Sequence, residues 1–285
     1  MRVSCVILTR GDRPADVARA VESARAQNGV DVEVVVVGNG ADPGSFDPAV
    51  KTLRLPDNIG IPAGRNRGVA LTTGDVVLFL DDDAYYASRD AVRHVVDAFA
   101  ADDRLGIVSL RITDPDGAPG ARRHVPRLRA GDAARSSEVT TFLGGACAVR
   151  RAVFDAVGGF PDAFFYAHEE TDLAWRALDA GYRIAYDADA EICHPALPPT
   201  RHREFFRLNA RNRVFLARRN LPWPIAFWYL VDWTLLTVVR TRHPRDLAAW
   251  FRGFGRGLVE PCGPRRRMRY RTAWRMARLG RPPII

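Results

Sequence analysis

Three consecutive aspartates, Asp81, Asp82 and Asp83, directly follow the apolar run 76–80. Carboxylates this close to one another repel unless a cation neutralises them. Their oxygens are hard ligands that suit Mg²⁺ or Mn²⁺. A solvated acidic turn before a helix would contain the same residue types, so the triplet alone does not decide between the two. It is a candidate metal site whose interpretation depends on the other motifs.

A glycine-rich segment at 58–68, with the sequence NIGIPAGRNRG, precedes that apolar run. Its glycines allow a ligand to approach the backbone closely, and Pro62 is suited to open a helix. The start of a helix beside Arg65 and Arg67 favours binding of an anion. An ordinary connection between a strand and a helix is the alternative for this segment taken alone.

Acidic residues also gather at the start of an expected helix, where Glu169, Glu170 and Asp172 lie within four residues. The helix dipole stabilises carboxylates in a first turn, but three such residues exceed what helix capping needs. His194 follows the short segment 191–193. A lone histidine is usually structural, although one at the carboxyl end of a strand can also bind a metal. These residues are therefore further candidates for a site.

Alternating strands and helices are expected to position these residues. We expect strands at 3–8, 32–37, 52–55, 76–80 and 107–110, and helices at 14–26, from Pro62 onward and at 88–101. The strand at 32–37 is β-branched and nearly all apolar, which is typical of a central parallel strand. Strands separated by helices predict a parallel α/β sheet with ligands at the carboxyl ends of its strands.

The pattern changes after residue 110. Residues 113–137 are rich in Gly, Pro, Ala and Arg and predict a mobile loop beside the site or a simple insertion. A strand at 141–149, a helix at 170–180 and short strands at 184–186 and 191–193 are expected to follow. From about His202 the chain is expected to be helical, basic and rich in aromatic residues.

The composition is that of a globular protein with an uneven charge distribution. Its 285 residues suffice for one large domain or two small ones, and 47% hydrophobic with 26% charged residues excludes a disordered or fibrous chain. The net charge of +9 divides into +16 for residues 201–285 and −7 for residues 1–200. A basic tail on an acidic body predicts a surface that meets an anionic partner.

Nothing in the sequence calls for an oxidising compartment or a membrane span. The cysteines are widely spaced, and the short N-terminal apolar run is typical of a first strand rather than a signal peptide. The helical part of the apolar stretch 222–239 is about 22 Å long, shorter than a hydrocarbon core of about 30 Å, and contains Asp232. We expect a cytoplasmic protein, with peripheral contact at the inner face of the membrane left open.

Taken in order, these segments resemble the family 2 glycosyltransferases of the GT-A fold. The resemblance extends to about residue 220 and rests on VSCVILTR, VEVVVVGNG, the segment at 58–68, FLDDDA, FLGGACAVRRAVFDAVGGFPDAFF, EETDLAWRALDAGYRI and ARN at 210–212. It implies a Rossmann-like, mostly parallel central sheet flanked by helices. The implied organisation is a GT-A catalytic domain at 1–200, with a nucleotide-sugar half at about 1–110 and an acceptor half at about 111–200, and a helical, basic, aromatic region at 201–285.

The resemblance also implies roles for single residues. In the family a D-x-D motif binds the divalent cation that holds the sugar-nucleotide diphosphate, so Mn²⁺ or Mg²⁺ is the implied cofactor. Asp83 and His194 are the implied metal ligands. The implied donor-binding residues are Thr9, Arg10, Asn39, Arg65, Asp81 and Asp82. Asp81 is the implied ribose contact, and Asn39 lies where relatives commonly have a carboxylate that recognises the nucleobase.

The family places its catalytic base in an acidic pair before x-D-L. Here the pair is Glu169 and Glu170, with Glu in the second place where the family usually has Asp. Glu170 is the implied base, with Glu169 as the alternative. Gly144, Gly145 and Asp172 fall on the implied acceptor side. The implied reaction is inverting transfer from a UDP- or dTDP-sugar to a hydroxyl of a glycan, a lipid-linked acceptor or a natural-product aglycone.

Two other functions fit parts of the sequence. A nucleotidyltransferase shares the α/β fold and acidic metal ligands, but its glycine-rich basic loop after the first strand has only a weak counterpart in residues 9–13, which contain one glycine. A non-enzymatic polyanion-binding protein would use the tail, with a helical stripe of Arg203, Arg207, Arg211 and Arg218 and a cluster around Arg265, Arg266 and Arg267.

Large aromatic residues in the tail help to choose between anionic partners. They include Trp223, Phe227, Trp228 and Trp233. Their apolar character favours a membrane surface over nucleic acid, for which no recognised module accompanies the arginines. Packing of these aromatics in a core, with solvated arginines, is the alternative.

Overall fold

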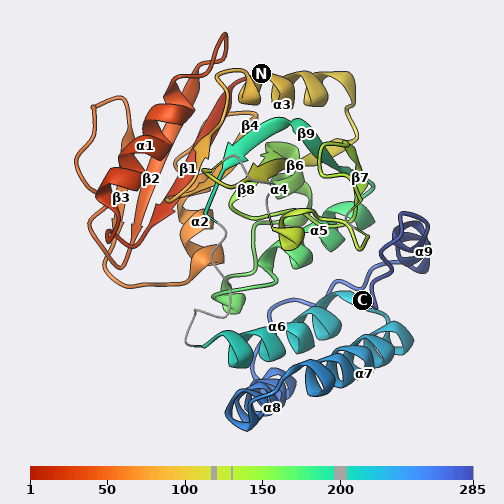
Figure 1. The fold of residues 1–285 in the computed structure, drawn as a ribbon. Helices are drawn as coiled ribbons and strands as arrows, with labels where there is room; N and C mark the ends of the chain where they lie inside the picture. The colour runs from red at the N-terminus through yellow and green to blue at the C-terminus, as the bar shows by residue number, and fades with distance from the viewer. Residues whose placement is uncertain (117–120, 130, 196–203, 285) are drawn as a thin grey trace.

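The computed structural model describes residues 1–116, 121–129, 131–195 and 204–284 of the chain. A central sheet lies between helices, and a group of C-terminal helices lies against one side of this α/β part (Figure 1). The predicted α/β class and the helical C-terminal region are therefore confirmed.

The first half of the sheet is parallel. It contains β1 (Val3–Thr9), β2 (Val32–Asn39), β3 (Lys51–Leu55) and β4 (Val76–Asp81) in the order β3-β2-β1-β4, with α1 (Pro14–Arg25) and α2 (Ile61–Val69) between them in the sequence. β1, β2 and β4 are buried because they consist mainly of apolar residues. Their carboxyl ends, at Thr9, Asn39 and Asp81, consequently meet at one edge of the sheet.

The second half of the sheet mixes strand directions. β8 (Ala146–Arg150) lies antiparallel between β4 and β6 (Leu105–Thr113), and β9 (Arg183–Cys193) runs parallel to β6. The short strands β5 (Tyr85–Tyr86) and β7 (Ser137–Val139) pair antiparallel with β9. Helices α3 (Ala91–Ala101), α4 (Arg151–Val157) and α5 (Glu169–Asp179) complete this half.

Hydrophobic residues form a core on each face of the sheet. On β1, Val6 belongs to the core that includes residues of α4 and α5, whereas Cys5 and Ile7 belong to the core that includes residues of α1 and α3. This alternation follows from the two-residue period of a strand. Helices therefore cover both faces and leave the edge at the carboxyl ends of β1, β2 and β4 available to a ligand.

Two expectations about strands are corrected by the structure. Residues 141–145 are not part of a strand, because β8 begins only at Ala146. The two short strands expected around 184–193 are one strand, β9, whose pairing with β6 shifts register between Leu110 and Arg111. The shift accommodates extra residues on β9, as a β-bulge does. The end of β9 still delivers His194 to the same edge as Asp81.

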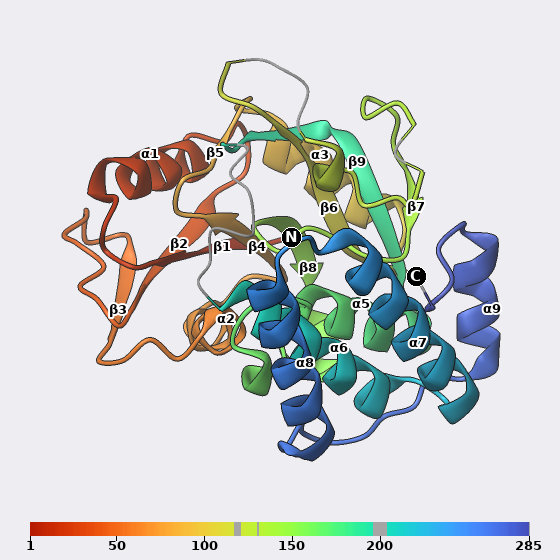
Figure 2. The same ribbon diagram turned by 60° about the horizontal axis from the view of Figure 1, so that its bottom comes forward.

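The C-terminal helices are α6 (Phe205–Asn220), α7 (Trp223–Arg240), α8 (Pro244–Val259) and α9 (Tyr270–Arg278). α8 packs closely on α6, as the turned view in Figure 2 shows. Two glycines allow this approach, because a Cβ at Gly253 would lie 2.0 Å from the carbonyl oxygen of Arg207 and one at Gly257 would lie 2.8 Å from that of Arg211. The tail is therefore a packed helical unit.

The outer side of α7 is apolar and exposed. Trp223, Phe227 and Trp228 are 57–60% exposed, whereas Trp233 is only partly buried against the core. The first three residues therefore do not form a core in this chain, which differs from the alternative considered above. Among the residues that the structure describes, no helix combines the length and the apolar character needed to cross a bilayer.

The expected arginine stripe on α6 is largely used for packing rather than displayed. Arg211 donates from Nη2 to the carbonyl oxygens of Ala163 and Phe164 at 2.9 and 2.8 Å. Arg218 donates from Nη1 to the carbonyl oxygens of Gly257 and Glu260 at 2.6 and 2.7 Å. Arg203 lies outside the described residues. Arg211 and Arg218 therefore connect α6 to its neighbours, which disfavours the alternative in which the whole stripe faces a polyanion.

Candidate active site

A cavity of about 890 Å³ opens at the carboxyl ends of β1, β2 and β4. The predicted residues that line it are Thr9, Arg10, Asn39, Arg65, Asp81, Asp82, Asp83, Gly144, Gly145, Glu169, Glu170 and His194. The structure thus brings together every predicted site residue except Asp172. This gathering follows from the topology, because parallel strands end at one edge and β9 adds His194 there.

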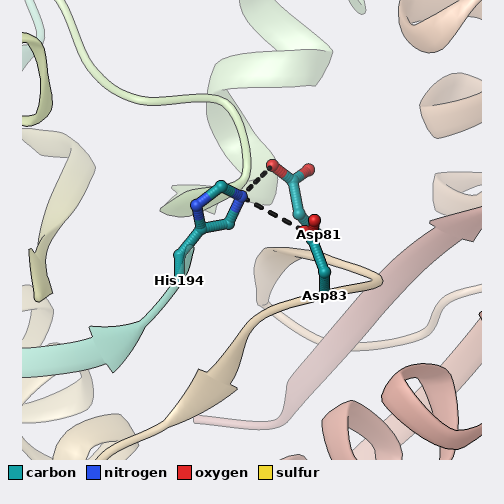
Figure 3. Close-up of side chains that lie close together, drawn as sticks. All are labelled: Asp81, Asp83 and His194. Atoms are coloured by element: carbon teal, nitrogen blue, oxygen red, sulfur yellow. Dashed lines mark ion pairs between the residues drawn. The ribbon is translucent and has the colours of Figure 1, made fainter. Parts of the chain in front are cut away.

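Asp81, Asp83 and His194 form a candidate metal site at the end of β4. Each offers one ligand atom, and these atoms lie within 4.8 Å of one another. Nε2 of His194 lies 3.6 Å from Oδ2 of Asp81 and 3.2 Å from Oδ1 of Asp83 (Figure 3). Two carboxylate oxygens and an imidazole nitrogen directed at one point form a donor set that fits Mn²⁺ or Mg²⁺. We term Asp81, Asp83 and His194 the metal group, which thus contains Asp81 besides the two predicted ligands.

The charges of this group balance one another. Burial alone would lower the pKa of His194, but Asp81 and Asp83 outweigh burial and raise it to about 10. His194 and Arg65 in turn hold the pKa of Asp81 at about 2, against the opposing effect of burial. The imidazole thus supplies positive charge beside the two carboxylates when it is protonated. A neutral imidazole is the form that binds metal, so metal binding would release this proton.

Arg13 is a site residue that sequence reasoning missed. Arg13 precedes α1 and forms ion pairs with two carboxylates of the aspartate triplet. Its Nη2 lies 2.9 Å from Oδ1 of Asp82, and its Nη1 pairs with Asp83. Burial raises the pKa of Asp82 to about 6, although the hydroxyl of Thr9 and the guanidinium of Arg13 partly oppose this. In the sequence, the position of Arg13 after a glycine in the loop 9–13 was the signal that could have identified it as a site residue. Arg13 fixes the aspartate triplet from the β1 side.

Arg65 lies at the centre of the cavity wall. Its side chain is 6% exposed, and Nη2 lies 3.1 Å from Oδ1 of Asp81. Nη1 lies 3.8 Å from Oε1 of Glu169 and also 3.8 Å from Oε1 of Glu170. One cation therefore faces the metal group and the acidic pair together.

Glu169 and Glu170 begin α5 and differ in accessibility. The side chain of Glu169 is 2% exposed, whereas that of Glu170 is 24% exposed. Burial raises the pKa of both carboxyls, and Arg65 partly opposes this increase. The charge of Glu170 contributes further to the raised pKa of Glu169. The pair therefore retains a proton more readily than two solvated glutamates would, and Glu170 is the member that a substrate can reach.

Gly144 and Gly145 form the wall that faces these groups. A Cβ at Gly144 would lie 2.2 Å from Oε1 of Glu170, and a Cβ at Gly145 would lie 1.9 Å from Oδ2 of Asp81. A larger residue at either place would have to displace the carboxylate that faces it. The two glycines bring the 141–145 segment close to the acidic pair and to the metal group.

The loop that leads into the acidic pair has an unusual backbone. Phe165, Ala167 and His168 all have positive φ, at 62°, 69° and 70°. Such φ values cost free energy for residues other than glycine and occur where surrounding contacts enforce them. Nδ2 of the fully buried Asn212 donates to the carbonyl oxygens of Tyr166 at 2.7 Å and Ala167 at 2.8 Å. α6 therefore holds the loop that positions Glu169 and Glu170.

Asp172 differs from its expected place on the acceptor side. Its side chain is fully buried and does not line the cavity. Its carboxylate accepts from Arg176, from Nε of Arg219 at 2.8 Å and from Nδ2 of Asn220 at 2.7 Å. The contacts with Arg219 and Asn220 direct the side chain of Asp172 towards α6. Asp172 thus fastens α5 to α6 beneath the cavity.

Asn39 lines the cavity, but its amide is already engaged. Nδ2 donates to Oδ1 of Asn58 at 2.9 Å and to the carbonyl oxygen of Gly60 at 3.2 Å, and Oδ1 accepts from the backbone N–H of Ile59 at 2.9 Å. In this arrangement Asn39 shapes the glycine-rich loop at the end of the cavity where β2 ends. Contact with a base would require it to exchange one of these partners.

A second histidine near the metal group was also missed. His124 lines the cavity, and the centroid of its ring lies 6.0 Å from that of His194. Burial lowers its pKa to about 4, so the ring is neutral at physiological pH. It lies in the segment expected to be a loop beside the site, where periodicity gives no signal for single residues.

Comparison with known proteins places this geometry in context. A family model described as glycosyl transferase family 2 matches residues 4–158. The chain is 27% identical over 237 residues to an N-acetylglucosaminyl-diphospho-decaprenol L-rhamnosyltransferase of Mycobacterium tuberculosis, covering 67% of this chain and 76% of that protein. It is also 30% identical over 141 residues to the O-antigen chain rhamnosyltransferase WbaN of Salmonella anatum, covering 46% and 44% of the two chains.

Solved structures share the fold at lower identity. The mannosyltransferase PcManGT from Pyrobaculum calidifontis, in complex with GDP-Man and Mn²⁺, has a TM-score of 0.56 and 17% identity over 98% of this chain and 73% of that chain. TarS 1–349 of S. aureus has a TM-score of 0.60 and 16% identity over 91% of this chain and 81% of that chain. These similarities support the GT-A fold.

Proposed function

The chain belongs to glycosyl transferase family 2 and is a glycosyltransferase, since the family model matches residues 4–158, more than half of its length, and we propose that it transfers a sugar from a nucleoside-diphosphate sugar to an acceptor hydroxyl with inversion at the anomeric carbon. The observation that carries the proposal is an acidic pair with one accessible member, Glu170, in the same cavity as the metal group. The family assignment favours glycosyl transfer over the nucleotidyltransferase and the non-enzymatic polyanion-binding alternatives.

The donor is proposed to be a UDP- or dTDP-sugar. Its diphosphate would lie at Asp81, Asp83 and His194, which fit a divalent cation. A bound Mn²⁺ or Mg²⁺ would supply positive charge to the departing diphosphate. The nucleoside would extend along Thr9, Arg10 and Asn39 towards the ends of β1 and β2.

Glu170 is proposed to act as the base. Its carboxylate takes the proton of the acceptor hydroxyl while the hydroxyl oxygen bonds to the anomeric carbon and the bond from that carbon to the diphosphate breaks. Arg65 is placed to stabilise the negative charge that grows on the diphosphate and to keep the base ionised. One base without an enzymatic nucleophile suits direct displacement.

The acceptor is proposed to be lipid-linked, and the protein to touch the membrane peripherally. The relative in M. tuberculosis acts, by its name, on a diphospho-decaprenol acceptor. The exposed aromatics of α7 and the positive charge of the tail support contact with an anionic lipid surface. Rhamnose is the first sugar to test, because both relatives described above are named rhamnosyltransferases.

Thermal unfolding with a panel of nucleotide sugars tests the donor. UDP-, dTDP- and GDP-sugars, dTDP-rhamnose among them, are added with Mn²⁺, and the largest rise in Tm identifies the base and the sugar. Product analysis then tests the reaction class, because a glycosyltransferase releases a nucleoside diphosphate and a nucleotidyltransferase releases pyrophosphate. Release of pyrophosphate, or no stabilisation by any nucleotide sugar, would contradict the proposal.

A further inference from the structure

A second pocket of about 70 Å³ lies at the junction of α5, α6, α7 and the segment after α9. A single water needs roughly 10–15 Å³, so this pocket can hold a larger polar group. Its charged and aromatic lining includes His168, Arg213, Tyr229, Trp233 and Arg281. His168 also lines the catalytic cavity, so the two spaces are neighbours on the side of the acidic pair.

Arg213 is buried in this pocket with neutral partners. It stacks on Trp233, with Cζ 3.3 Å from the ring centroid. Nε donates to Oδ1 of Asn209 at 3.0 Å, and Nη1 donates to the hydroxyl of Tyr229 at 3.2 Å. A guanidinium has five N–H donors, and these two bonds leave others for a ligand. The guanidinium of Arg213 is therefore held in one orientation and keeps N–H donors available to a ligand.

The positive charge of the pocket is not neutralised by the described residues. Neither Arg213 nor Arg281 has a carboxylate among the groups that act on its charge, and burial lowers the pKa of both. The segments outside the described ranges contain no Asp or Glu. By contrast, the buried Arg176 and Arg219 both pair with Asp172. Among the described residues, a carboxylate therefore neutralises the arginines there, and none neutralises the two in the pocket.

His168 supplies a third, independent sign of a ligand. Its Nε2 is buried and has no hydrogen-bond partner among the residues that the structure describes. Buried polar atoms without partners are uncommon in folded proteins. The strained backbone of His168, with φ of 70°, keeps the ring between the pocket and the cavity. A hydrogen-bonding group in the pocket would supply a partner for Nε2 of His168.

We propose that this pocket binds a phosphoryl group of the acceptor through Arg213, Arg281 and His168. The inference rests on the proposed glycosyl transfer and specifies a phosphate or diphosphate ester as the acceptor class. The donor diphosphate has its own place at Asp81 and Asp83, whereas the pocket adjoins the acidic pair that the acceptor hydroxyl must reach. Arginines suit phosphoryl oxygens because their planar fork matches them.

Phosphate binding tests the pocket directly. Inorganic phosphate is titrated with EDTA present, and Tm is measured for the full chain and for Arg213→Gln, Arg281→Gln and Arg278→Gln. Arg278 is exposed at the end of α9 and carries the same charge, so Arg278→Gln is the matched control. We expect the affinity for phosphate to fall about 10-fold or more in the two pocket variants and to stay unchanged in the control. The unliganded pocket variants should match or exceed the wild-type Tm, because they remove an uncompensated buried charge.

The same titration on Asp83→Ala locates the phosphate. Phosphate stabilisation that survives in Asp83→Ala and is lost in Arg281→Gln supports the pocket. Wild-type phosphate affinity in both pocket variants, or loss of binding in Asp83→Ala alone, would overturn the inference.

Acceptor kinetics separate an acceptor phosphoryl from free phosphate. Two acceptors with the same sugar, one a prenyl phosphate ester and one a methyl glycoside, are compared in Arg281→Gln. We expect KM for the phosphate ester to rise about 10-fold or more, with KM for the methyl glycoside and for the donor unchanged. Equal effects on both acceptors would refute the assignment to the acceptor. Phosphate binding in the pocket without any sugar transfer by the wild type would instead refute the proposed function alone.

Discussion

Arg65 and Asp81 are joined at 3.1 Å between Nη2 and Oδ1, across the floor of the catalytic cavity. The other terminal nitrogen of the same guanidinium lies 3.8 Å from Glu170. The side chain thus connects the end of β4 to the start of α5. A change in charge at Asp81 therefore alters the electrostatic environment of Glu170 through a single side chain.

Replacing Arg65 by lysine should separate these two functions. Lysine keeps the positive charge but cannot present two nitrogens to Asp81 and Glu170 at once. We expect kcat to fall about 10- to 100-fold, the effect of losing a charged hydrogen bond, while the chain remains folded. Steady-state kinetics with far-UV circular dichroism checks this, and unchanged kcat in Arg65→Lys would show that the bridge is dispensable.

Asp83→Ala should abolish the metal dependence of donor binding. The variant removes one of the three converging ligand atoms and leaves Arg13 with Asp82. We expect Mn²⁺ to raise the Tm of the wild type in the presence of a nucleoside diphosphate and to have no such effect on the variant. The assignment is wrong if Mn²⁺ does not change diphosphate affinity in the wild type.

Glu170→Gln should slow transfer by roughly 10²–10⁴-fold, the usual range for loss of a general base. Glutamine keeps the size and removes the basicity, so donor binding should survive. Glu169→Gln is the matched control on the same helix turn, and it should be milder because Glu169 is nearly inaccessible. A reversed order would assign the base to Glu169, and normal transfer in both variants would contradict the mechanism.

The buried pair should make stability fall as pH rises. Burial and the neighbouring Glu170 raise the pKa of Glu169 to about 8 in the folded chain, above its unfolded value of roughly 4.3. Between these two pKa values the folded state binds a proton that the unfolded state has released. The contribution of this proton to stability is complete below pH about 4 and is lost as pH rises through about 8. Tm measured from pH 5 to 9 should drop further in the wild type than in Glu169→Gln. Parallel curves would disprove the shift.

Membrane contact should depend on salt and on the outer side of α7. Polybasic contacts contribute about 1 kcal/mol per Lys or Arg near an anionic surface and are screened by salt. We expect vesicles with phosphatidylglycerol to sediment the protein at low salt and release it at high salt. The double variant Phe227→Ser, Trp228→Ser should bind more weakly, whereas Leu71→Ser, a change at an exposed apolar residue outside the tail, should not. Absence of binding at low salt would exclude this surface as a lipid contact.

Residues at strand ends could be predicted from the sequence, because a parallel sheet gathers those ends at one edge. Asp81, Asp83 and His194 are of this kind, whereas the metal-binding roles of Asp83 and His194 were predicted through the family resemblance. Glu169 and Glu170 were predicted through the family resemblance. Their environment, with one buried and one accessible carboxylate, depends on packing against Arg65 and could not be inferred from the acidic pattern.

Contacts made by long side chains across distant segments could not be predicted. Arg13 lies in a loop without periodicity, and its pairing with Asp82 and Asp83 depends on where α1 begins. Asp172 is acidic and lies in the first turn of α5, as the acidic pair does, yet its carboxylate accepts from Arg219 of α6 and does not line the cavity. The arginines of α6 formed a plausible exposed stripe, but α8, whose glycines allow a close approach, covers them in part.

The hold of Asn212 on the 164–167 loop sets an order in which activity can arise during synthesis. The aspartate triplet and the acidic pair leave the ribosome before residue 212, whose amide donates to the carbonyl oxygens of Tyr166 and Ala167 in the loop before Glu169. A nascent chain that ends before α6 would therefore carry the chemical groups without this support for their geometry. We expect sugar transfer to become available only after α6 has docked against the loop.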